Sequence, residues 1–178
     1  MPRYFQRKIR TLLQESDDAP TSDEKGNKLE ELTRYLFEKV PGVSFYGKNI
    51  LDDNRAHELD VVFWNATNQS EISFLDLVLI VECKNTGSPV SSSDVGWFVR
   101  KLQDRGVNCA ILVALNGITG IADGASNAHS EVLSALIRDK IKILVIKREE
   151  ILAFTHTNDL VELLKKKIMA LILYKTVL

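Results

Sequence analysis

Apolar residues recur with helical spacing in the first part of the chain and predict two helices there. The spacing appears over residues 3–14 and then, as a stronger stripe, over about 23–40, where Pro41 and Gly42 end it. The stretch 15–22 between them is polar and contains a proline. We therefore expect a linker between the two helices.

The pattern then becomes strand-like. Residues 43–46 form a short candidate strand, and 58–64 form a stronger one that is rich in β-branched and aromatic side chains. A polar cluster at 65–70 has the composition of a turn. The apolar run over 74–83 that follows predicts a buried strand.

The second half of the chain alternates between helical and strand-like segments. The sequence predicts a helix at about 94–105, a strand at 109–115, a helix at about 124–138, a strand at 141–146 and a helix at about 158–174. This order predicts an α/β three-layer sandwich in which helices flank a central mixed sheet, with the later strands parallel and joined by right-handed crossovers. We expect 1–22 to form a basic N-terminal helix and linker, and 23–178 to form one domain.

Composition and charge narrow the class of protein. The 178 residues, 45% hydrophobic and 26% charged, are typical of a soluble globular domain. The sequence shows no membrane-spanning stretch or signal peptide, and its two cysteines predict no disulfide framework, so we expect a cytoplasmic protein without membrane attachment. A net charge of −1 argues against nucleic-acid binding by bulk charge. Basic clusters at 3–10 and 165–167 are either local phosphate contacts or solvated helix faces.

The strand predicted over 74–83 ends in charged residues. Its aliphatic run presents Glu82 and Lys84 two residues apart, so both side chains lie on one face of the strand. The side chain of Cys83 then faces the core on the opposite side. Two charges at the end of an apolar strand are costly unless they pair, bind a metal or take part in chemistry. This strand end is therefore a candidate site.

Asp60 is the expected partner of this strand end. If the two strands form an antiparallel hairpin, Asp60 lies opposite Glu82, and Glu58 lies opposite Lys84. Two carboxylates at that spacing can hold one hard divalent cation, and without a cation their repulsion raises the pKa of one of them. The alternative is an ion pair at the strand end, with Glu58 as the cross-strand partner of Lys84.

Three segments together resemble a known superfamily. They are Gly26-Asn27-Lys28-Leu29-Glu30, Glu58-Leu59-Asp60-Val61-Val62 and Val81-Glu82-Cys83-Lys84-Asn85. In this order they resemble the motifs of the PD-(D/E)xK nucleases, which have the restriction-endonuclease-like fold, and most closely those of Mrr-like restriction endonucleases. The resemblance covers about residues 23–150. Leu59 replaces the proline of the name-giving motif and Leu29 replaces a frequent phenylalanine, but neither position carries a functional group.

The resemblance implies a metal-dependent endonuclease that hydrolyses DNA phosphodiester bonds, in restriction or host defence. Asp60, Glu82 and the backbone carbonyl of Cys83 would bind Mg²⁺ or Mn²⁺, and Glu30 would complete the ligand set directly or through water. Lys84 would orient the attacking water and stabilise charge on the phosphate. A homodimer is expected for double-strand cutting, and a specificity or effector partner would choose the target.

Several alternatives remain at this point. Glu58, Asn85 and Gln103 are further candidates to support the ligands or to contact duplex or branched DNA. Glu30 lies in an acid-rich helix, so it is either a ligand or a solvated carboxylate. Other functions that fit the same motifs are a Holliday-junction or repair resolvase and a catalytically silent nuclease-fold interaction module.

Overall fold

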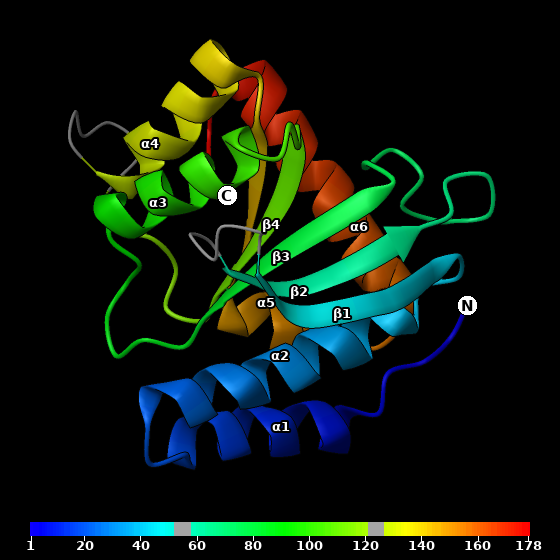
Figure 1. Ribbon diagram of the computed structural model, residues 1–178. Helices are drawn as coiled ribbons and strands as arrows, with labels where there is room; N and C mark the ends of the chain where they lie inside the picture. The colour runs from blue at the N-terminus through cyan, green and yellow to red at the C-terminus, as the bar shows by residue number, and fades with distance from the viewer. Residues whose placement is uncertain (52–57, 121–126) are drawn as a thin grey trace.

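A five-stranded mixed sheet forms the centre of the computed structural model, which describes residues 1–51, 58–120 and 127–178 (Figure 1). Its strands are β1 (Val43–Leu51), β2 (Glu58–Asn65), β3 (Val78–Lys84), β4 (Cys109–Ala114) and β5 (Lys142–Ile146), in that order across the sheet. β1, β2 and β3 pair antiparallel, whereas β3, β4 and β5 pair parallel. The predicted mixed sheet with parallel later strands is confirmed.

Helices flank the sheet on both faces. They are α1 (Gln6–Asp18), α2 (Ser22–Glu38), α3 (Ser92–Gln103), α4 (Ala128–Ser134), α5 (Arg148–Ala153) and α6 (Thr157–Met169), with the π-helical turns η1 (Ala135–Asp139) and η2 (Ala170–Tyr174) following α4 and α6. Neighbouring side chains of β3 show the layering, because Cys83 contacts Thr33 of α2 whereas Glu82 contacts Lys101 of α3. Successive strand residues point to opposite faces, so α2 and α3 lie on opposite sides of the sheet.

The N-terminal helix is longer than predicted, and the expected linker at 15–22 is largely helical. α1 continues to Asp18, and Thr21 already caps α2 by accepting a hydrogen bond from the backbone N–H of Glu24. Tertiary contacts hold the polar residues that suggested a linker. The Ser16 hydroxyl donates to a backbone carbonyl of α2, and Asp17 accepts two hydrogen bonds, at 2.7 and 2.8 Å, from the guanidinium of Arg148. No local sequence pattern reveals such distant partners.

Other element boundaries shift by a few residues. β1 runs on to Leu51 past a bulge after Phe45, and β3 starts at Val78 rather than at 74. Residues 124–126 of the predicted 124–138 helix lie outside the described residues, and α4 begins at Ala128.

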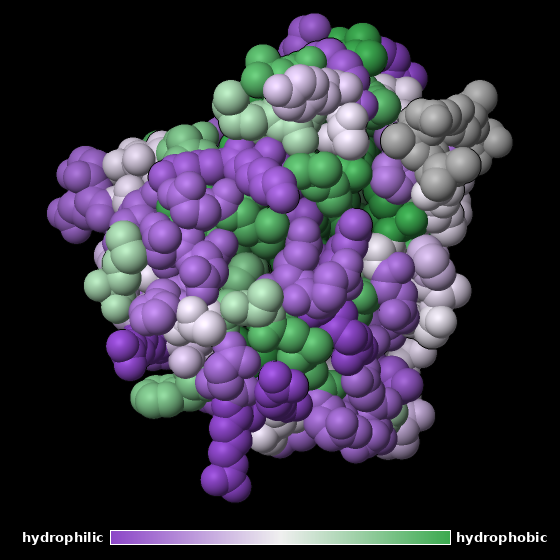
Figure 2. All heavy atoms as spheres, turned by 180° about the vertical axis from the view of Figure 1, so that it is seen from behind, coloured by the Kyte–Doolittle hydropathy of each residue, from purple (hydrophilic) through white to green (hydrophobic). Residues whose placement is uncertain are grey.

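The face of the molecule that points away from the viewer in Figure 1 carries both hydrophilic and hydrophobic residues. Figure 2 shows apolar patches lying between hydrophilic side chains on that face, as on an ordinary protein surface. Within the described ranges, no helix combines the length and the apolar character needed to cross a bilayer.

The core between α2 and the sheet depends on aromatic packing. Phe63 of β2 is fully buried and stacks on Phe37 of α2, with ring centroids 5.3 Å apart. The next residue, Trp64, points to the other face and is 48% exposed. We expect Phe63→Ala to lower the free energy of unfolding by about 3–5 kcal/mol because it removes a ring from a closed core. Trp64→Ala should cost about 1 kcal/mol or less.

Urea unfolding of both variants measures this difference. Similar losses for Phe63→Ala and Trp64→Ala would mean that the faces of β2 are not assigned correctly.

Candidate functional site

The predicted site residues meet at a cleft where the N-terminal part of α2 faces the ends of β2 and β3. The cleft has a volume of 400 Å³ and is lined by Ser22, Asp23, Gly26, Asn27, Glu30, Asn49, Glu58, Asp60, Cys83 and Lys84. Glu82 lies behind this surface and is 2% exposed. The structure therefore brings together Glu30, Asp60 and Lys84 at one opening, with Glu82 beneath it.

The register of β2 and β3 places Asp60 beside the E-x-K segment. Val61 pairs with Val81 and Val62 with Ile80, so the same register sets Asp60 opposite Glu82. This arrangement was predicted. In addition, Asp60 Oδ2 accepts a 2.7 Å hydrogen bond from the backbone N–H of Cys83, which fixes its carboxylate against β3.

Glu82 and Lys84 lie on one side of β3, and Cys83 lies on the other. Glu82 Oε1 is 3.1 Å from Lys84 Nζ, whereas Cys83 Sγ is 3.3 Å from Thr33 Oγ1 on α2. The predicted alternation is confirmed. The Cys83 side chain is buried against α2, away from the Glu82 carboxylate.

Lys101 is a site residue that the sequence did not reveal. Its ammonium donates to both oxygens of Glu82, at 3.0 Å to Oε1 and 2.9 Å to Oε2. Lys101 lies in the last turn of α3 and is only 6% exposed. The sequence offers a faint signal, because Lys101 stands three residues after Phe98 and beside Leu102, at the edge of the buried stripe of the helix. That position alone does not distinguish a buried lysine from a solvated one.

Burial is the main electrostatic influence on Asp60. It raises the pKa of the Asp60 carboxyl to about 7, and repulsion from Glu82 adds to the effect. The hydrogen bond from the Cys83 N–H opposes the rise and is the largest of the opposing influences. A raised pKa was predicted from like-charge crowding, but desolvation contributes more than the neighbouring charge.

Glu30 carries an oxygen that lacks a hydrogen bond. Its side chain is 10% exposed, and Oε2 has no hydrogen-bond partner among the described residues, although Lys48 Nζ of β1 lies 3.3 Å away. Burial raises the pKa of Glu30, and the charge of Lys48 opposes the rise. Lys48 also donates to Asn27 at 3.0 Å. Sequence reasoning missed Lys48 because a single lysine on an edge strand has no distinguishing pattern.

The other candidates lie at different places. Glu58 lines the cleft and is exposed. Asn85 instead donates to Ser16 and, at 3.3 Å, to Asp17 of α1, so it ties the first helix to the end of β3. Gln103 is exposed and lines a separate groove beside α3 and α4.

Asp60 supplies one carboxylate at the cleft, and the β2–β3 register sets the buried carboxylate of Glu82 opposite it. Carboxylate oxygens are the ligands that a hard divalent cation prefers. Across the described parts of the chain, no three or more His, Cys, Asp or Glu side chains are grouped closely enough to hold a metal together. Glu30 therefore does not join the other two as a third direct ligand in this arrangement. Glu30 still lines the cleft, where a water could bridge its carboxylate to a cation.

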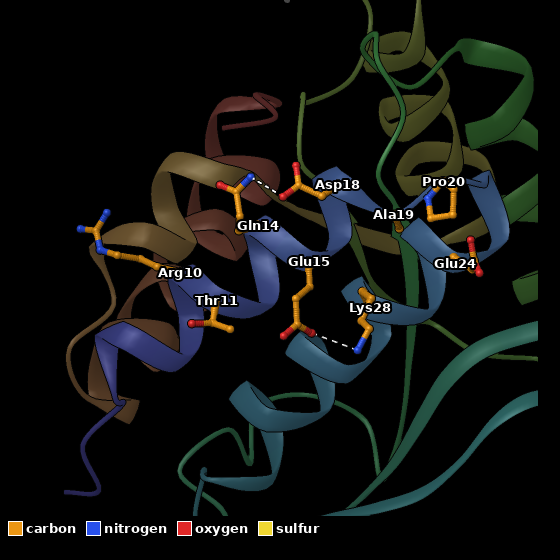
Figure 3. Close-up of a pocket in the computed structure, with 9 residues that line it drawn as sticks. All are labelled: Arg10, Thr11, Gln14, Glu15, Asp18, Ala19, Pro20, Glu24 and Lys28. Atoms are coloured by element: carbon orange, nitrogen blue, oxygen red, sulfur yellow. Dashed lines mark hydrogen bonds and ion pairs between the residues drawn. The ribbon is translucent and has the colours of Figure 1, made fainter.

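A larger hollow lies between α1 and α2 but offers less chemistry. Its volume is 770 Å³, and Figure 3 shows two pairs of side chains along it, Glu15 with Lys28 and Gln14 with Asp18. Lys28 Nζ is 2.9 Å from Glu15, and Gln14 donates to Asp18 at 2.9 Å. Both pairs join exposed side chains, whereas the smaller cleft holds Asp60, whose carboxyl has a raised pKa, so the smaller cleft is the better candidate site.

Comparison with known proteins identified no relative of this chain. No family model, curated protein or solved structure matches the chain. The functional argument therefore depends on the geometry of the cleft.

We expect the stability of the protein to report the ionisation of Asp60. The folded-state pKa of Asp60 lies near 7, above the ordinary value near 4. The contribution of Asp60 to the free energy of unfolding therefore falls as the pH rises from about 4 to 7. Asp60→Asn keeps an acceptor for the Cys83 N–H but cannot ionise. The free energy of unfolding of Asp60→Asn minus that of wild type should therefore rise by about 2–4 kcal/mol as the pH is raised from 4.5 to 8 in EDTA.

Urea unfolding at several pH values measures this gain. A difference between the two proteins that stays constant with pH would contradict the raised pKa.

Proposed function

We propose that this protein is a metal-dependent nuclease that hydrolyses DNA phosphodiester bonds. The observation that carries the proposal is the pairing of strands β2 and β3, which sets Asp60 opposite Glu82 with Lys84 Nζ 3.1 Å from the Glu82 carboxylate, at the edge of a cleft. Two carboxylates and a lysine in this relation suit phosphodiester hydrolysis. The motifs that resemble those of PD-(D/E)xK nucleases fall on these same positions.

The architecture supports the proposal. An antiparallel β1–β2–β3 meander follows α2, and the parallel strands β4 and β5 continue the sheet beyond β3. This arrangement is compatible with a restriction-endonuclease-like sandwich, which we propose as the fold. The cleft lies where β3 ends, at Cys83 and Lys84.

Different side chains would bind the metal ion and stabilise the phosphate. Asp60 and Glu82, with the Cys83 carbonyl, would hold Mg²⁺ or Mn²⁺, and Glu30 would reach it through water. When bound, such a cation polarises a phosphoryl oxygen and lowers the pKa of water. Lys84 places an ammonium beside Glu82, where its donors can orient a water and stabilise the charge of a phosphate.

A catalytically silent interaction module is the second candidate, and one observation favours it. Both oxygens of Glu82 already accept hydrogen bonds from Lys101, and Oε1 also contacts Lys84. A carboxylate satisfied in this way can serve structure alone. Among the described residues, Asp60 has a single hydrogen bond, from the Cys83 N–H, and Glu30 has a single ion pair, with Lys48, so both carboxylates are less fully paired than Glu82 and we favour the nuclease.

We also propose a homodimer, because a domain with one site needs two copies to cut both strands of a duplex. A specificity or effector partner would then select the target. Neither proposal is needed for the chemistry at a single phosphodiester bond.

The proposed function predicts metal-dependent DNA cleavage. Wild type should nick supercoiled plasmid with Mg²⁺ or Mn²⁺ and lose activity in EDTA. Glu82→Gln and Lys84→Ala should each lower the rate by about 100-fold or more, because the first removes the charge of a metal ligand and the second removes the ammonium that stabilises the phosphate. The matched control is Glu150→Gln. Glu150 lies on α5, is not among the site residues, and also contacts a buried lysine, Lys167, at 2.6 Å. It should cut within about twofold of wild type.

The substrate set separates the candidate functions. Duplex plasmid, four-way junctions and single-stranded DNA should be tested together. Cleavage confined to junctions would indicate a resolvase. If none of these substrates is cut, and neither Mg²⁺ nor Mn²⁺ binds, the silent-module function would replace the nuclease.

A further inference from the structure

Lys101 is an internal cation at the candidate metal site. Its side chain is 8% exposed, and its ammonium lies 2.9–3.0 Å from both oxygens of Glu82, whose side chain is 2% exposed. A buried carboxylate without a partner is strongly destabilising. Lys101 therefore allows Glu82 to remain charged and fixed in the absence of any metal ion.

Charge balance explains what this cation does to the site. Asp60 and Glu82 supply two negative charges when both are ionised, and Lys84 and Lys101 supply two positive charges. With both carboxylates ionised, these four side chains carry no net charge even without a divalent cation. A cation placed beside Glu82 gains less attraction than the two carboxylates alone would provide, because it also meets two ammonium groups.

The hydrogen bonds restrict Glu82 as well. A carboxylate offers about four lone-pair sites. Lys101 contacts both oxygens, and Lys84 contacts Oε1. Oε2 therefore keeps the most free acceptor capacity, so Glu82 can bind a metal through one oxygen while Lys101 stays in place.

We propose that Lys101 is a positioning residue that holds Glu82 before a divalent cation arrives and weakens the binding of that cation to Asp60 and Glu82. The inference rests on the proposed function, because it assumes that these carboxylates bind a metal. The two possible roles of Lys101 predict opposite changes in metal affinity when the residue is removed. Removing a group that merely orients a metal ligand weakens metal binding, whereas removing Lys101 should strengthen it.

Calorimetric titration with Mn²⁺ tests the inference. Lys101→Met keeps the length of the side chain but removes its charge, and we expect it to lower the Kd for Mn²⁺ about tenfold or more. In EDTA the same variant should be less stable than wild type, and Mn²⁺ should raise its Tm more than that of wild type. Lys167→Met is the matched control, because Lys167 is 3% exposed and pairs with Glu150. It should lose stability without any change in the Kd.

A second variant, Lys101→Gln, provides the same test if Lys101→Met does not fold. Lys101→Gln retains an amide NH₂ as a donor for Glu82 but carries no charge, and it should also bind Mn²⁺ more tightly than wild type. Equal or weaker binding by whichever variant folds, while wild type binds Mn²⁺ and Glu82→Gln abolishes that binding, would overturn the role of Lys101 alone. If neither wild type nor the Lys101 variants bind Mn²⁺, the metal site fails, and with it both the inference and the proposed nuclease.

Discussion

The buried carboxylate of Glu82 is the constraint on which the site depends. It ends an aliphatic strand, is 2% exposed, and is held from one side by Lys84 and from α3 by Lys101. Without these partners the end of β3 would expose an unpaired charge to a low-dielectric interior. The crossing of α3 over β3 and the chemistry of the cleft are therefore linked through one side chain.

The helices on the other face of the sheet shape the mouth of the cleft. α2 brings Glu30 and Asn27 to the opening, and Lys48 reaches them from β1. α1 supports this arrangement through Asn85, which follows β3 and binds Ser16 and Asp17. The first helix is thus tied to the strand that carries the site, rather than attached through a linker.

The sequence predicted the strands and the convergence of the site well because those features are local. An aliphatic run ended by Glu82 and Lys84, and an acid on the preceding strand, suggested a hairpin with Asp60 opposite Glu82, and the antiparallel register of β2 and β3 agrees with it. Helix lengths and polar partners were less predictable. The helical character of 15–18 depends on distant contacts such as that between Asp17 and Arg148, which no window of sequence contains.

Lys101 and Lys48 illustrate the same limit inside the site. Both are lysines on elements whose periodic pattern favours exposure or leaves it open, and their roles arise from what the fold places opposite them. Conversely, Asn85 and Gln103 follow the motif strand in sequence, yet the first binds α1 and the second lines another groove. Proximity along the chain predicted the carboxylates and Lys84 but neither Lys101 nor Lys48.

The most direct test of the nuclease account is the anomalous scattering of Mn²⁺ in crystals of the wild-type protein. The account predicts one strong peak between Asp60 and Glu82, at about 2.1 Å from a carboxylate oxygen of each, with Glu30 connected through water. A cleft without metal at millimolar Mn²⁺, or a peak that neither of these carboxylates coordinates, would contradict it.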